Sequence, residues 1–165
     1  MAIRTEKFAD VLRELIEEIT GKREDVRFDD GISGVVYGCI TKNNVIIQSN
    51  VEYYLVGRDN SKEQGIRKSL RSKFLPLLEQ SFDLFVMLHE IGHTITCVGL
   101  NYKTIRTERA MFIQYAQFNL KPGTVARRYR QTTQERKADE FAYDWMIGNP
   151  ERVKYYAEKF ERALK

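Results

Sequence analysis

Residues 84–100 read Leu-Phe-Val-Met-Leu-His-Glu-Ile-Gly-His-Thr-Ile-Thr-Cys-Val-Gly-Leu, and this stretch decides the fold. Wound as a helix it is apolar nearly all round, which is typical of a helix buried in the middle of a protein. Pro76 suits the first turn of such a helix, so we expect the helix to run from about residue 76 to about residue 98. The polar exceptions are His89, Glu90 and His93, and buried polar groups need partners.

These exceptions form the pattern H-E-x-x-H, whose two histidines are the only ones in the chain. Histidines four residues apart project from one face of a helix, so both ring nitrogens can reach one Zn²⁺ at about 2.0–2.1 Å. Glu90 is the next residue round the helix and can reach a water at the metal, which is the position of a general base. The alternative interpretation is a pair of core histidines satisfied by ordinary hydrogen bonds.

A catalytic zinc site needs a third protein ligand, which here must be a carboxylate or Cys97 because no third histidine exists. Cys97 lies one turn beyond His93, but ligands at 89, 93 and 97 would span about 12 Å along the axis. One ion cannot be reached from all three positions unless the helix breaks. A packed thiol is therefore favoured for Cys97, as for Cys39 in its apolar strand-like run.

The better candidate is Glu135, in a helix expected over residues 132–147. Asp139 is four residues further on and faces the same way. Glu135 can complete a His₂Glu site, and Asp139 can accept the N–H of a ligand histidine and so fix its tautomer. The alternative is that Glu135, Arg136 and Asp139 form a surface laced with salt bridges.

The remaining patterns predict an α+β fold in a single domain over residues 1–165. An amphipathic helix is expected at 5–20, strands at 34–40 and 45–48 with a further one at 51–57, a basic helix at 61–73 and a last helix at 150–164. We expect the small β-sheet, about residues 34–57, to pack against the helix that bears His89. Residues 99–131 have weak periodicity and are expected to be a loop with short irregular elements.

Charge and composition fit a globular protein of 165 residues with a formal net charge of +4. Two basic runs contribute the excess, one within residues 62–73 and one within residues 121–137, and their simplest interpretation is a solvated surface. A nucleic-acid surface is the weaker alternative, because no DNA-binding motif accompanies the runs. The N-terminus lacks the apolar region of a signal peptide, and no run is long enough to cross a membrane, so we expect a cytoplasmic protein.

The two motifs together resemble the ImmA/IrrE-type (DUF955) zinc metallopeptidase family. The resemblance rests on L-H-E-I-G-H-T at 88–94 and on E-x-x-A-D-x-F-A at 135–142, and it covers roughly residues 30–147. It implies a zincin-like fold and a gluzincin-type endopeptidase with zinc on His89, His93 and Glu135 and with Glu90 catalytic. It also implies cleavage of a helix-turn-helix repressor of a phage or mobile element.

The sequence departs from the family after residue 142, in its long linker between the motifs, and at Cys97, where some members carry a histidine. The donor that would stabilise an oxyanion stays open among four tyrosines: Tyr102, Tyr115, Tyr129 and Tyr143. A second functional hypothesis also stays open, namely a non-catalytic, zinc-stabilised interaction protein of a mobile element. Glu90 favours the enzyme, because a purely structural site needs no base.

Overall fold

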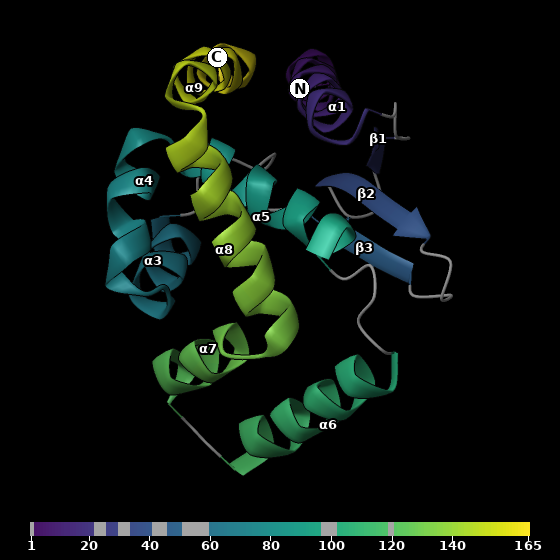
Figure 1. The fold of residues 1–165 in the computed structure, drawn as a ribbon, viewed down its shortest axis with the longest axis vertical. Helices are drawn as coiled ribbons and strands as arrows, with labels where there is room; N and C mark the ends of the chain where they lie inside the picture. The colour runs from purple at the N-terminus through teal and green to yellow at the C-terminus, as the bar shows by residue number, and fades with distance from the viewer. Residues whose placement is uncertain are drawn as a thin grey trace.

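The computed structural model describes residues 2–21, 26–29, 34–40, 46–50, 60–96, 102–118 and 121–165 (Figure 1). Its helices are α1 (Ala2–Thr20), α3 (Asn60–Ser69), the 3₁₀ turn η1 (Ser72–Phe74), α4 (Leu75–Gln80), α5 (Phe82–Thr96), α6 (Tyr102–Phe118), α7 (Pro122–Arg130), α8 (Thr133–Gly148) and α9 (Pro150–Leu164). In this part of the chain, no helix has both the length and the apolar character that a membrane crossing requires.

The prediction of an α+β domain is wrong, because nearly all of the residues whose side chains are described lie in helices. Among those residues, the buried core lies on helices, on η1 or at Leu70 beside it. The apolar pattern of residues 84–100 led to the expectation that a sheet covers this helix. In the structure, the helices α8, α4 and α9 contact α5, and the long segment expected to be irregular supplies two more helices.

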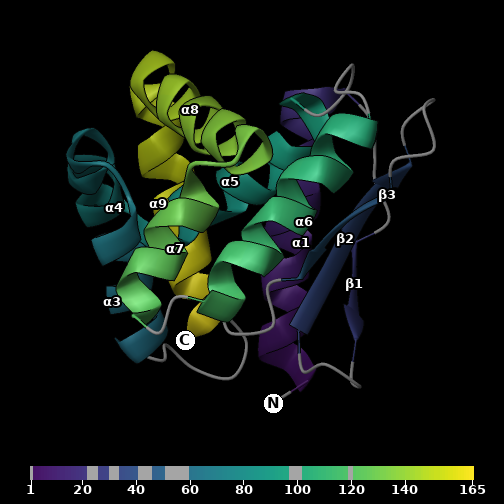
Figure 2. The same ribbon diagram turned by 90° about the horizontal axis from the view of Figure 1, so that it is seen from below.

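Strand pairing is described for three short backbone segments, β1 (Val26–Asp29), β2 (Gly34–Ile40) and β3 (Ile46–Asn50), which pair antiparallel in that order (Figure 2). The sequence analysis did not predict β1, and the strand expected at 51–57 lies outside the described residues. Strand β3 contacts α5, the helix of His89, but the side chains of the strands lie outside the described residues. Among the described side chains, the core is built from helices.

The predicted long helix over residues 76–98 is two helices, because the chain becomes extended at Ser81 (φ −162°, ψ 103°). The Leu84 backbone N–H donates to Ser81 Oγ at 3.3 Å, so Ser81 acts as an N-cap and starts α5 afresh. The described part of α5 ends at Thr96, so Cys97 lies beyond it. The helices expected at 132–147 and 150–164 are confirmed as α8 and α9.

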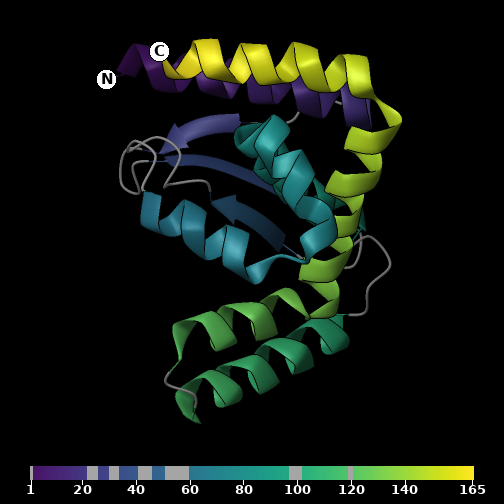
Figure 3. The same cartoon turned by 90° about the vertical axis from the view of Figure 1, so that its left-hand side faces the viewer.

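The expectation of an irregular linker over residues 99–131 is wrong, since α6 and α7 fill most of it. They form a pair of helices at one end of the molecule, beneath the start of α8 (Figure 3). Phe112 on α6 packs against Tyr129 on α7 with ring centroids 5.1 Å apart. Glu108 on α6 accepts bonds from the backbone N–H and hydroxyl of Thr133, the first residue of α8. These contacts attach the α6–α7 pair to α8.

Helices α1 and α9 lie side by side and antiparallel at the opposite end of the molecule (Figure 3). Phe8 packs on Phe160 with ring centroids 4.9 Å apart, and both are fully buried. Polar bonds flank this contact, from Lys159 to Glu14 and from Arg152 to Glu18. Helix α9 of this pair contacts α5, which lies between the α1–α9 pair and the α6–α7 pair (Figure 1).

Candidate metal centre

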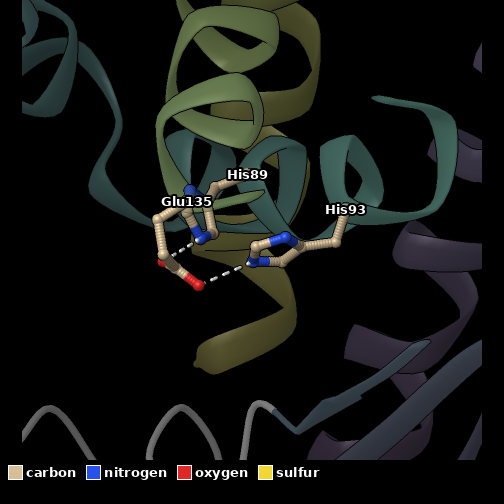
Figure 4. Close-up of side chains that lie close together, drawn as sticks. All are labelled: His89, His93 and Glu135. Atoms are coloured by element: carbon tan, nitrogen blue, oxygen red, sulfur yellow. Dashed lines mark ion pairs between the residues drawn. The ribbon is translucent and has the colours of Figure 1, made fainter. Parts of the chain in front are cut away.

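The two histidines of the motif lie where α5 meets the first turn of α8 (Figure 4). His89 and His93 are 4% and 6% exposed, and their rings meet edge to face with centroids 4.6 Å apart. Glu135 on α8 faces both: Oε2 lies 3.3 Å from His89 Nε2, and Oε1 lies 3.3 Å from His93 Nε2. The predicted ligand residues are therefore brought together by the fold.

Close packing of small residues lets the two helices approach near enough for this. A Cβ added at Gly92 would lie 3.0 Å from the Cα of Ala138 and 3.1 Å from its carbonyl oxygen. Both positions belong to the motifs that carry the ligands: Gly92 precedes His93, and Ala138 follows Glu135 by three residues. The glycine is needed here for the close approach of two backbones.

Asp139 anchors His89 through the other ring nitrogen. Its Oδ1 lies 2.8 Å from His89 Nδ1, and the same oxygen accepts a bond from Arg130 Nη1 at 2.9 Å. Because Asp139 accepts from both groups, the 3.4 Å between Arg130 Nη1 and His89 Nδ1 reflects a shared acceptor. Nδ1 thus carries the hydrogen, and Nε2 is left to face Glu135.

The carboxylates of Asp139 and Glu135 stabilise the protonated form of His89. Burial and the nearby charge of Arg130 lower the pKa of His89, but hydrogen bonds with Asp139 and Glu135 outweigh them and raise it to about 9. Burial raises the pKa of Glu135, but its bonds to His89 and His93 hold it well below its usual range. Without metal, the centre is an imidazolium–carboxylate cluster in which a proton takes the place of the cation.

His93 is held less firmly than His89. Its Nδ1 is buried and has no hydrogen-bond partner among the described residues. The ring is positioned by Glu135 on one side and by the His89 ring on the other. Buried polar atoms left unpaired are costly, about 1–3 kcal/mol.

The spacing of the cluster leaves room for one metal ion. His89 Nε2 lies 3.3 Å from Glu135 Oε2, and His93 Nε2 lies 3.3 Å from Glu135 Oε1. One ligand atom from each of the three residues lies within 4.8 Å of the other two. This buried group could hold a metal ion, and two imidazoles with one carboxylate are a donor set that suits zinc.

Glu90 and Tyr129 border the cluster. Glu90 is half-buried on α5, and Tyr129 is 43% exposed on α7. Burial, the charge and hydrogen bond of Glu135, and the charge of Glu90 all raise the pKa of Tyr129, while the charge of Arg130 lowers it. The Tyr129 phenol therefore stays neutral and able to donate, close to both carboxylates.

The structure separates the other tyrosines from this centre. Tyr143 packs on Phe74, with ring centroids 5.5 Å apart. The Lys73 ammonium lies over the Tyr143 ring, 4.7 Å from its centroid. Tyr115 stacks with the Arg128 guanidinium. The side chain of Tyr102 and the whole of Cys97 lie outside what the structure describes. Of the four tyrosines left open by the sequence, Tyr129 is the one described beside Glu135.

Sequence reasoning missed the role of Arg130. It was counted only within a basic run, but its side chain is mostly buried and bridges toward Glu135 at 3.8 Å as well as to Asp139. The available signal was its place in the run close before the E-x-x-A-D motif. The contact of Arg130 with Asp139 forms only because α7 folds back onto α8, and the spacing of the two residues in the sequence does not predict it.

The chain matches no model of a known protein family, and neither the curated proteins nor the solved structures contain a match to it.

Proposed function

We propose that this protein is a zinc-dependent endopeptidase. The observation that carries the proposal is the convergence of His89, His93 and Glu135 on one buried point, with Asp139 behind His89 and Glu90 alongside. Three protein ligands leave a fourth position for water, which is the arrangement of catalytic rather than structural zinc. The resemblance of both motifs to ImmA/IrrE-type metallopeptidases supports the same function.

In the proposed reaction, a bound zinc ion would supply Lewis acidity. His89, His93 and Glu135 would hold the ion, and Asp139 would keep His89 in the tautomer whose Nε2 is free to ligate. Glu90 takes the proton of the attacking water and returns it to the leaving amine as the C–N bond breaks. The Tyr129 hydroxyl, which bonds to Glu135, would donate to the carbonyl oxygen as negative charge develops there.

A protein substrate is part of the proposal. The family resemblance points to a helix-turn-helix repressor encoded beside the enzyme on a phage or mobile element. The polar cluster itself does not select a sequence, so substrate choice would depend on surfaces around it. We propose that regulation comes from a partner or from expression.

The test compares zinc-loaded wild type with Glu90→Gln on the neighbouring repressor and on a proteome-derived peptide library. Both proteins should bind one zinc ion, measured by metal analysis, because the three ligands are intact. Glu90→Gln should cleave about 10²–10⁴-fold more slowly. Glu158→Gln, on the exposed face of α9, is the matched control and should cleave at the wild-type rate.

Two outcomes contradict the proposal. Equal cleavage by wild type and Glu90→Gln would exclude Glu90 as the base. Full zinc loading with no cleavage of the repressor or of any library peptide would favour the zinc-stabilised interaction protein instead.

A further inference from the structure

A small cavity lies where the end of α3 and η1 meet α7 and α8, behind the metal centre. Its volume is about 240 Å³, and four arginines line it: Arg71, Arg127, Arg130 and Arg136. Figure 1 shows α3, α7 and α8 converging at this corner of the molecule. The arginines come from both basic runs of the sequence, which the fold brings to one place.

The cavity carries more positive charge than the protein neutralises. Among the residues that the structure describes, Asp139 is the one carboxylate in the cavity wall, and it is bound to Arg130. Arg71 reaches Glu140 at 3.1 Å, but Glu140 is shared with Lys73 at 2.6 Å. Within the described parts of the chain, Arg127 and Arg136 form no ion pair. Several guanidinium groups held near one another repel, and a bound anion would offset that repulsion.

The residue type indicates the ligand chemistry. The planar fork of a guanidinium matches the oxygens of a phosphate, which it can bind through two parallel hydrogen bonds. The cavity is smaller than the usual range of about 300–1,000 Å³ for sites that enclose a drug-sized ligand. A phosphate group with more than one negative charge therefore suits it better than a large cofactor.

We propose that this cavity is a binding site for the phosphate group of a small anion. Arg127 and Arg136 supply the unpaired charges, and Arg71 and Arg130 contact the anion from the walls. The proposal does not depend on peptidase activity.

Arg130 would connect this site to the metal centre. Its Nη1 donates to the Asp139 oxygen that anchors His89, and the same side chain lines the cavity. An anion that draws Arg130 toward itself competes with Asp139 for the guanidinium. Anion binding and metal binding are therefore expected to influence each other, by the same factor in both directions.

The test uses metal-free protein and calorimetric titration with inorganic phosphate, pyrophosphate and a nucleoside monophosphate at constant ionic strength. The double variant Arg127→Gln/Arg136→Gln should bind each probe at least tenfold more weakly. These side chains are exposed, so the variant should keep the fold, which its circular dichroism spectrum checks. The matched control is Arg106→Gln/Arg109→Gln on α6, which removes the same charge from exposed positions outside the cavity.

The probes also separate the sources of the phosphate. Tighter binding of the nucleoside monophosphate than of inorganic phosphate would indicate a nucleotide, and the reverse order a free inorganic anion; either supports the site. Three results would overturn it: no binding of any probe at millimolar concentration, equal weakening in both double variants, or tighter binding of a single-stranded oligonucleotide than of all three probes.

Discussion

His89 Nδ1 and Asp139 Oδ1 lie 2.8 Å apart, so the ring of the first histidine is fixed by a carboxylate one helical turn beyond Glu135. Because both carboxylates come from α8, the helix that supplies Glu135 also orients His89. His93 has no such anchor among the described residues. The two histidines are therefore unequal, and substitutions around them should have unequal effects.

Metal binding is expected to depend most on Glu135 and less on Asp139. Glu135→Ala removes a ligand and should abolish tight binding, whereas Asp139→Asn should weaken zinc affinity by about 10–100-fold. Affinity is measured by competition with a coloured chelator. Asp144→Asn makes the same change on the exposed face of α8 and is the control. An unchanged affinity in Asp139→Asn would show that the bond to His89 does not support the ligand.

The stability of the metal-free protein is expected to fall with rising pH. The pKa of His89 is raised to about 9 in the folded protein, above its ordinary value of 6.5. The folded state thus binds this proton more tightly, and the resulting stability is fully present below about pH 6.5 and is lost as pH rises through 9. Urea unfolding between pH 6 and pH 9.5 measures it, and His89→Asn should flatten the profile. An equally steep loss in that variant would assign the effect to another group.

Gly92→Ala should destabilise the protein by about 1–2 kcal/mol, because the added methyl meets the Ala138 backbone at 3.0–3.1 Å. Gly65→Ala on α3 is the matched control, since a Cβ there meets nothing within 4 Å. That change should stabilise by up to about 1 kcal/mol through helix propensity. Chemical unfolding curves give both values. Two changes of the same sign would contradict the close approach of α5 and α8.

Glu108→Ala should cost about 1–2 kcal/mol, because the carboxylate accepts bonds from both Thr133 N–H and Thr133 Oγ1 at the start of α8. Glu158→Ala removes a carboxylate from an exposed pair with Arg162 and should cost less than about 0.5 kcal/mol. Urea unfolding of both variants makes the comparison. Similar losses would mean that the bond between α6 and α8 adds nothing beyond a surface ion pair.

The sequence predicted that His89, His93 and Glu135 would lie together, because the determinants of this cluster are local. His89 and His93 share a helix face by spacing alone, and so do Glu135 and Asp139. His89, Glu90 and His93 are the polar exceptions on an otherwise apolar helix, and a buried helix offers such side chains few polar partners. Only the docking of the two helices had to be assumed, and the Gly92–Ala138 approach provides it.

The sequence did not predict α6, α7 or the packing around α5, because the determinants of these features are not local. Helix α6 exposes Met111, Ile113 and Phe118, so its apolar residues do not trace a buried stripe. It is attached through Phe112 to Tyr129 and through Glu108 to Thr133, contacts that no periodicity reveals. The apolar pattern of residues 84–100 predicted that this helix is buried, but it did not identify the elements that pack against it. A sheet was therefore expected where helices pack.

The order of events during folding follows from where α6 and α7 sit in the chain. They lie between α5 and α8, so His89 and Glu135 meet only after this whole segment has closed as a loop. Closing this loop lowers the entropy of the chain before the contacts between α5 and α8 can stabilise the fold. A metal ion held by His89, His93 and Glu135 would bind only after that step, and its bonds would have to break before the helices could separate. Loading with metal is therefore expected to lengthen the lifetime of the native state while leaving the folding rate unchanged.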